Sequence, residues 1–149
     1  MTGDPTILLV EDNPDDALLT TRALTQGNLR NEVIHVRDGV EALDHLFGTG
    51  DRAGDGPADL PVVMLLDLKL PKLDGLDVLR RVRAHERTRL LPVVILTSSQ
   101  EEQDLVSGYE LGANSYVVKP VDFGGFADAV HELGLYWVLL NKHPGAPPG

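Results

Sequence analysis

Four short and nearly continuous runs of apolar residues constrain the fold of this chain more than any other feature. They are Ile7–Val10, Val62–Leu66, Val93–Leu96 and Tyr116–Val118. Apolar runs of this length, without polar alternation, are typical of parallel strands that are buried on both faces of a sheet. Stretches with helical spacing separate the runs, so we expect strands and helices to alternate.

A polar side chain stands directly after each run. Glu11 and Asp12 follow the first run, Asp67 the second, Thr97 the third and Lys119 the fourth. Parallel strands end at the same edge of a sheet, and in open α/β sheets ligands bind in the crevice at that edge. The sequence therefore predicts that three carboxylates, one hydroxyl and one ammonium group share a single crevice.

Helix and strand signals fill the intervals between the runs. Asn13 and Pro14 suit the N-cap and first position of a helix that we expect to end at Gln26, before Gly27. Val33–Val36 predicts a further strand. Five strands that alternate with five helices predict an α/β fold with a doubly wound parallel sheet, because right-handed crossovers dominate such connections.

The second and third helices carry weaker signals. Asp38 and Glu41 resemble a capping box, and the apolar stripe expected behind it consists of Val40, Leu43 and Phe47. The segment 48–60 is rich in Gly and Asp, so we expect a surface loop there. Lys72 and Asp74 are expected to be solvated turn residues before a helix that carries Leu76, Leu79 and Val82.

The fourth helix is expected to begin at Ser98 or Ser99 and to end near Gly112. The fifth is expected to begin near Phe123. Its apolar face consists of Phe126, Val130, Leu133, Trp137 and Leu140.

Composition limits the classes of function. Thirteen Lys and Arg against 23 Asp and Glu give 149 residues a formal net charge of −10, which repels nucleic acids and anionic membranes. The chain has no Cys, no signal-peptide pattern at its start and no apolar stretch long enough to span a membrane. We expect a cytoplasmic protein with one domain over residues 1–142 and a disordered tail over 143–149.

The predicted crevice has the chemistry of a phosphoryl site. Crowded carboxylates stay ionised at neutral pH when a cation compensates them, and Mg²⁺ favours carboxylate oxygens together with phosphate oxygens. Glu11, Asp12 and Asp67 could bind Mg²⁺, and Asp67 could also be the nucleophile of an aspartyl-phosphate. Lys119 and Thr97 would then contact the remaining phosphoryl oxygens.

Together these residues resemble the receiver domains of two-component response regulators. The matching positions are Glu11-Asp12, Asp67 with the segment up to Gly75, Thr97-Ser98 and Lys119-Pro120. The resemblance covers residues 6–140 and implies a flavodoxin-like sheet in the order 2-1-3-4-5 with five helices. It also implies a stand-alone, phospho-accepting signalling protein that catalyses only its own phosphorylation and dephosphorylation.

The resemblance further assigns roles to single residues. It implies that a sensor histidine kinase phosphorylates Asp67, that the backbone carbonyl of Lys69 joins the Mg²⁺ ligands, and that the Lys119–Pro120 peptide bond is cis. It places the switch aromatic of the family at Tyr116, which could equally be an ordinary packing residue. A phosphoryl group on Asp67 would draw in the Thr97 hydroxyl and leave space for the Tyr116 ring.

Two other functions compete with this interpretation. An aspartyl-phosphate-forming hydrolase of the haloacid dehalogenase type also uses an Asp at a strand end, but it needs a second carboxylate two residues later, where this chain has Lys69. The other alternative is a binding module that has kept the receiver shape and does not depend on phosphorylation. The complete set of acids, hydroxyl and ammonium argues against it.

The last helix is apolar on more than one face over residues 133–140. Either it is deeply buried, or a second copy of the chain covers it in a homodimer. The dimer or partner residues would be Tyr136, Trp137, Leu139 and Leu140. The segment 131–142 also resembles single-domain regulators that pair with phytochrome-type histidine kinases, which suggests a light-sensing kinase as partner.

Overall fold

Strands and helices alternate through the part of the chain that this computed structural model describes, residues 6–26, 31–49, 60–70, 72–97 and 110–133. The elements in chain order are β1 (Ile7–Val10), α1 (Pro14–Gln26), β2 (Val33–Val36), α2 (Gly39–Phe47), β3 (Val63–Asp67), α3 (Gly75–Ala84), β4 (Val93–Thr97), β5 (Ser115–Val118) and α5 (Phe123–Glu132). The apolar runs predicted as strands match the observed strands to within one residue at either end.

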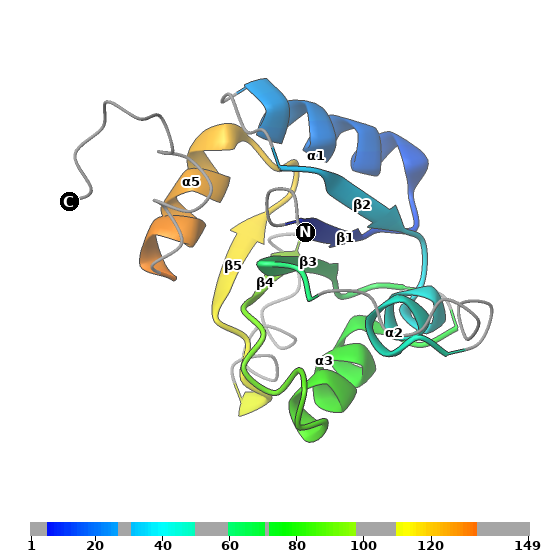
Figure 1. Cartoon of the computed structure of the whole chain (residues 1–149). Helices are drawn as coiled ribbons and strands as arrows, with labels where there is room; N and C mark the ends of the chain where they lie inside the picture. The colour runs from blue at the N-terminus through cyan, green and yellow to red at the C-terminus, as the bar shows by residue number, and fades with distance from the viewer. Residues whose placement is uncertain (1–5, 27–30, 50–59, 71, 98–109, 134–149) are drawn as a thin grey trace.

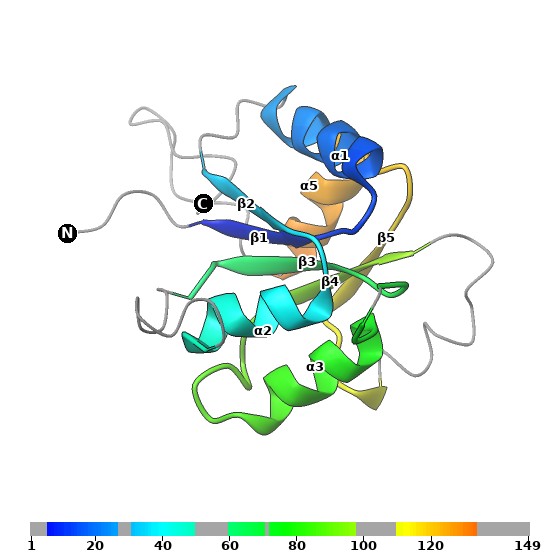
Figure 2. The same ribbon diagram turned by 90° about the vertical axis from the view of Figure 1, so that its right-hand side faces the viewer.

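The five strands form one parallel sheet in the order β2-β1-β3-β4-β5, which confirms the predicted topology. Helices α1 and α5 cover one face, and α2 and α3 cover the other (Figures 1 and 2). Four helices lie in the described residues. The range expected for the fourth predicted helix falls mostly on residues 98–109, outside them.

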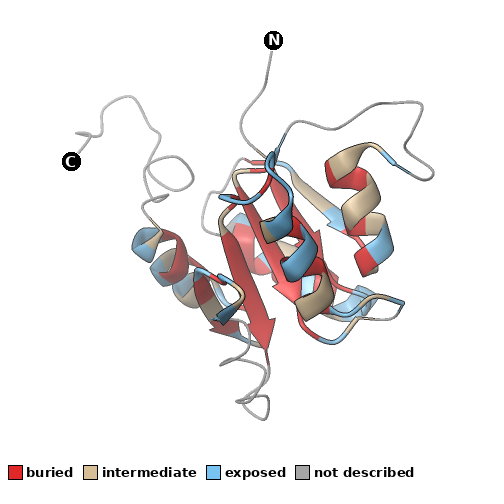
Figure 3. Ribbon diagram, turned by 90° about the horizontal axis from the view of Figure 1, so that it is seen from below, coloured by how far each residue is buried: buried red, intermediate tan, exposed pale blue. Residues whose placement is uncertain are grey.

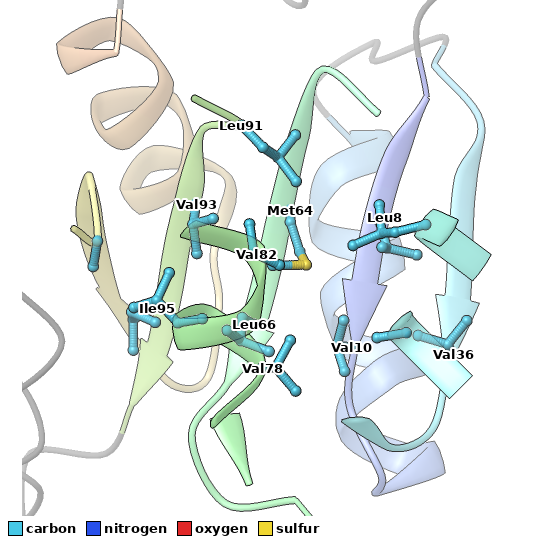
Figure 4. Close-up of a cluster of buried hydrophobic side chains, with 14 of the residues drawn as sticks. Leu8, Val10, Val36, Met64, Leu66, Val78, Val82, Leu91, Val93 and Ile95 are labelled. Carbon is cyan, nitrogen blue, oxygen red and sulfur yellow. The ribbon is translucent and has the colours of Figure 1, made fainter. Parts of the chain in front are cut away.

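The three central strands carry the core. Every residue of β1, β3 and β4 is buried, whereas the edge strands β2 and β5 are buried only in part (Figure 3). Alternate residues of the central strands enter two apolar clusters, one on each face, and Figure 4 shows the cluster beneath α2 and α3. Burial of each aliphatic side chain contributes about 1.5–3 kcal/mol to the free energy of folding. The core therefore holds the ends of the strands in a fixed register.

Polar side chains set the starts of the first two helices as predicted. The Asn13 Oδ1 atom accepts hydrogen bonds from the backbone amides of Asp15 and Asp16, at 2.8 and 3.0 Å. Asp38 Oδ1 accepts from the amide of Glu41 at 2.8 Å. These bonds satisfy amides that have no partner within the helix.

The predicted apolar stripe of α2 is right only in part. Val40 is 44% exposed, while Ala42 and Leu46 are buried. The reason is the close approach of Gly39 to the next segment: a Cβ atom there would lie 2.3 Å from the backbone oxygen of Leu73. The helix therefore turns the face of Gly39, Ala42 and Leu46 toward the core. Leu43 and Phe47 are partly buried against the same cluster, and Val40 of the predicted stripe is left exposed.

The turn before α3 also differs from the prediction. Asp74 is the N-cap of α3, and its Oδ1 atom accepts from the amide of Asp77 at 3.0 Å. Lys72 is solvated as expected, with its ammonium 3.5 Å from Asp38 Oδ2, and its φ of 68° is in the left-handed region. The turn is therefore held by the side-chain cap of Asp74, whereas the sequence predicted only solvated residues there.

Candidate phosphoryl and metal site

The carboxyl ends of the strands deliver the predicted polar groups to one edge of the sheet. Glu11 follows β1, Asp67 and Thr97 are the last residues of β3 and β4, and Lys119 follows β5. The first three are almost wholly buried, with exposed fractions of 0–3%, whereas Asp12 is exposed. The site thus has a buried acidic floor and one acid at its open side.

Lys119 joins these groups through its ammonium. The Nζ atom donates to Asp67 Oδ2 at 2.9 Å and to Glu11 Oε1 at 3.3 Å, and it lies 3.6 Å from Asp16 Oδ2. Asp16 comes from the first turn of α1. Its closeness to Glu11 and Asp12 along the chain was the only sign in the sequence that Asp16 would lie near Lys119.

The three predicted acidic residues form a candidate divalent-cation site. One carboxylate oxygen from each of Glu11, Asp12 and Asp67 lies within 4.8 Å of the others. The backbone amide of Asn13 donates to Glu11 Oε2 at 3.1 Å, and that of Lys69 donates to Asp67 Oδ1 at 3.0 Å. All three acids offer hard oxygen ligands, the donor type that Mg²⁺ and Mn²⁺ take.

The crowding of negative charge changes the protonation of the site. Burial, and then the hydrogen bond and charge of Asp67, raise the pKa of Glu11 to about 7. Burial alone would lower the pKa of Lys119, but the Asp67 and Glu11 carboxylates outweigh it and raise that pKa. One ammonium therefore does not fully compensate the acids, and the site favours a further cation.

Thr97 ends β4, and Tyr116 lies on β5 two residues before the partner of Thr97, because the register pairs Thr97 with Val118 and Ile95 with Tyr116. The Thr97 carbonyl accepts from the Lys119 amide at 2.7 Å, so the β4–β5 ladder continues to the site. The Thr97 side chain is buried. Tyr116 is half-buried and packs against the apolar cluster beneath α2 and α3. The Lys119–Pro120 peptide bond is cis.

Two predictions concern other parts of the molecule. The proposed dimer or partner residues lie outside the described residues, as does most of the segment that suggested a phytochrome-type partner; they are Tyr136, Trp137, Leu139 and Leu140. Among the described residues, no helix is both long and apolar enough to cross a membrane.

Comparison with known proteins identifies the family. Residues 7–131 match the model of the response regulator receiver domain. The chain therefore belongs to the receiver domain family, and it is a response regulator of two-component signal transduction. This class of signalling protein accepts a phosphoryl group from a histidine kinase and carries a divalent-metal site in its acidic pocket.

Similar proteins match nearly the whole chain. The structure of the bacteriophytochrome response regulator AtBRR is 55% identical, with a TM-score of 0.83, and the match covers 95% of this chain and 100% of that one. The probable methanogenesis regulatory protein FilR2 of Methanothrix harundinacea is 41% identical over 93% of this chain and 87% of that protein. The Mn²⁺-bound form of response regulator Rcp1 is 33% identical, with a TM-score of 0.72, over 96% of this chain and 99% of that one.

Proposed function

We propose that Asp67 is the phosphoacceptor of this response regulator and that Mg²⁺ is its physiological metal. The observation that carries the proposal is the contact of Lys119 Nζ with Asp67 Oδ2 at 2.9 Å, with the carboxylates of Glu11 and Asp12 beside it. A carboxylate held this way keeps one oxygen on the ammonium and can present the other to phosphorus. The Mn²⁺-bound form of Rcp1 supports a divalent ion in such a pocket.

The reaction is an in-line transfer. An Asp67 carboxylate oxygen forms a bond to the phosphorus of a phosphohistidine, the P–N bond breaks, and the imidazole leaves and takes up a proton. Mg²⁺, when bound by Glu11, Asp12, Asp67 and the Lys69 carbonyl, supplies positive charge to the phosphoryl oxygens. Lys119 compensates a second oxygen, and the buried Thr97 hydroxyl donates to the third.

The same groups provide a switch. The new phosphoryl charge draws the Thr97 side chain toward Asp67, and the half-buried Tyr116 ring moves into the space that Thr97 leaves. This shift changes the surface next to β5. The phosphoryl group must bind the two arrangements with different affinity for the change to act as a signal.

The surface of this protein beside the site is suitable for binding a sensor histidine kinase. Leu18 and Leu19 of α1 are about half exposed. Next to them a groove of about 240 Å³ is lined by Asp16, Leu19, Thr20, Lys119, Pro120 and Val121. An apolar patch that borders the reactive centre can bind the donor protein while its phosphohistidine reaches Asp67.

The relatives and the composition of the chain support a choice of partners. The similarity to AtBRR supports a phytochrome-type kinase as phosphoryl donor. A homodimer through the final helix would cover the apolar residues that the sequence places there. The net charge of −10 favours signal output through a protein partner rather than nucleic acid, and a cytoplasmic location suits phosphotransfer from a sensor kinase.

Incubation with acetyl phosphate and Mg²⁺, followed by intact-mass spectrometry, tests the proposal. The wild type should gain about 80 Da, the mass of one phosphoryl group. The Asp67→Asn variant should not, while Asp128→Asn, which changes an exposed acid on α5, should behave as the wild type. A gain on Asp67→Asn would assign the acceptor to another residue, and no gain on the wild type would refute phosphoacceptor function.

A further inference from the structure

His35 makes a contact with the acidic turn that neither the family resemblance nor the metal chemistry accounts for. It lies on the edge strand β2 and is exposed, yet its Nε2 atom is 2.7 Å from the backbone oxygen of Glu11. A carbonyl oxygen can only accept a hydrogen bond, so Nε2 must carry the proton. The imidazole therefore acts as a donor to the backbone of the first candidate metal residue.

The end of the β1–β2 ladder explains why a side chain makes this bond. The last ladder bond runs from the amide of Glu11 to the carbonyl of Val36, at 3.1 Å. β2 ends at Val36, and the chain then turns toward Asp38, the N-cap of α2. The next acceptor on the β1 side is the Glu11 carbonyl, and a partly buried carbonyl requires a donor. His35 supplies that donor from its side chain.

The hydrogen bond from His35 to the Glu11 carbonyl affects the neighbouring residue, Asp12. The oxygen of Glu11 and the amide of Asp12 belong to one planar peptide unit. A hydrogen bond to that oxygen fixes the rotation of the plane and therefore the direction in which the Asp12 side chain leaves the backbone. Asp12 is exposed, so packing cannot hold it, whereas Glu11 is also held by the amide of Asn13 at its carboxylate.

We propose that His35 is a positioning residue for the divalent-cation site: its Nε2–H bond orients the Glu11–Asp12 peptide so that both carboxylates face the cation. The inference rests on the proposed function of Glu11, Asp12 and Asp67 as metal ligands. His35 itself does not bind the metal, because the nitrogen that faces the site donates to the carbonyl. Groups that orient metal ligands in this way affect affinity about 10–100-fold.

Two substitutions of His35 separate a positioning bond from a general effect on the fold. Glutamine carries an N–H donor as many bonds from Cα as Nε2 of histidine, whereas the amide of asparagine is one bond closer to the backbone. His35→Gln can thus rebuild the hydrogen bond, and His35→Asn cannot. Both variants are polar and lie on an exposed position, so a mere loss of strand stability would affect them alike.

The first measurement is Mg²⁺ and Mn²⁺ affinity of the full chain by isothermal titration calorimetry, with melting curves of the metal-free proteins to show that each is folded. His35→Ala and His35→Asn should bind about tenfold more weakly than the wild type, and His35→Gln within about threefold of it. His131→Ala, at the far end of α5, is the control and should bind as the wild type does.

The second measurement is the rate of phosphorylation by acetyl phosphate at limiting and at saturating Mg²⁺. A positioning residue changes the Mg²⁺ concentration for half-maximal rate about tenfold and leaves the maximal rate within about twofold. Equal affinity in all variants, or a loss in His35→Ala that His35→Gln does not restore, would overturn the inference. A wild type that binds neither metal would instead refute the proposed metal site, and this inference with it.

Discussion

Charged side chains have opposite kinds of partner at the carboxyl ends and at the amino ends of the strands. At the carboxyl ends, the ammonium of Lys119 faces Glu11, Asp16 and Asp67, and Asp12 adds a fourth acid. At the amino ends of β4 and β5, the half-buried cation Arg83 meets neutral acceptors among the described residues: its guanidinium donates to Leu91 O at 2.8 Å, to Gly112 O at 2.7 and 3.1 Å, and to Asn114 Oδ1 at 3.0 Å.

The difference shows how one fold separates stability from function. Every bond of this cluster, which we call the Arg83 clamp (Arg83, Leu91, Gly112 and Asn114), ties α3 to the segments that lead into β4 and β5. The carboxyl-end site instead leaves acids in excess of cations, a state that costs stability until a further cation binds. Charge with satisfied neutral partners stabilises the fold, and uncompensated like charge creates a ligand site.

The largest expected effect tests the role of Lys119. Replacement of Lys119 by Ala removes the positive charge from Asp67 and from the developing phosphoryl charge, so the rate of phosphorylation by acetyl phosphate should fall about 100-fold. Lys72→Ala is the matched control, because that ammonium is solvated and 3.5 Å from Asp38. A rate within threefold of the wild type in Lys119→Ala would show that the ammonium only compensates the carboxylate charges of the metal-free site.

Arg83→Ala tests the opposite edge. The change removes the hydrogen bond to the carbonyl of buried Leu91 and those to the exposed Gly112 and Asn114, so we expect a loss of about 1–2 kcal/mol in the free energy of unfolding, measured by urea denaturation. Phosphorylation at saturating Mg²⁺ should stay within twofold. Arg80→Ala, which removes an exposed pair with Asp77, should cost less than about 0.5 kcal/mol. Equal losses in both variants would remove the distinction between the two edges.

The pH dependence of metal binding sharpens the comparison. Because the pKa of Glu11 in the fold is raised to about 7, the folded metal-free protein binds this proton more tightly than the unfolded chain. The stability of the metal-free protein should therefore fall as pH rises from the ordinary value of a Glu side chain to about 7. A cation competes with the same proton, so Mg²⁺ affinity should rise about tenfold between pH 6 and pH 8.

Calorimetric titrations at the two pH values measure this difference. Glu11→Gln has no carboxylate to titrate at this position, and its weaker Mg²⁺ affinity should vary less with pH. An affinity in the wild type that is the same at pH 6 and pH 8 would show that the Glu11 proton does not compete with the metal.

The strand ends explain why so much of the site could be predicted. A buried run fixes where a strand stops, and the residue after it must lie at the sheet edge, so Glu11, Asp67 and Lys119 followed from position alone. Asp16 and His35 could not be found in this way. Asp16 reaches the site from α1, and His35 from an edge strand through a backbone carbonyl, so neither contact leaves a spacing pattern in the sequence.

The helix faces were less predictable, because apolar spacing does not say how closely a backbone can approach its neighbour. The small residues Gly39 and Ala42 let α2 pack tightly and turn their face into the core, so Val40 of the predicted stripe is exposed while Leu43 and Phe47 are only partly buried. The cap at Asp74 did leave a signal: an Asp directly before Gly75 and a helical repeat is typical of an N-cap.

The smallest predicted effect concerns Asp74, which lies on the segment between the acceptor strand β3 and α3, the helix that carries Arg83. Its side chain holds the Asp77 amide, and Asp74→Ala should lower the free energy of unfolding by about 1 kcal/mol, measured by urea denaturation. Asp74→Asn retains an accepting oxygen and should cost only a few tenths. Because the cap orders α3 and does not touch the carboxyl-end site, Mg²⁺ affinity should not change. A weaker affinity in Asp74→Ala would instead show that the start of α3 also positions the Lys69 carbonyl.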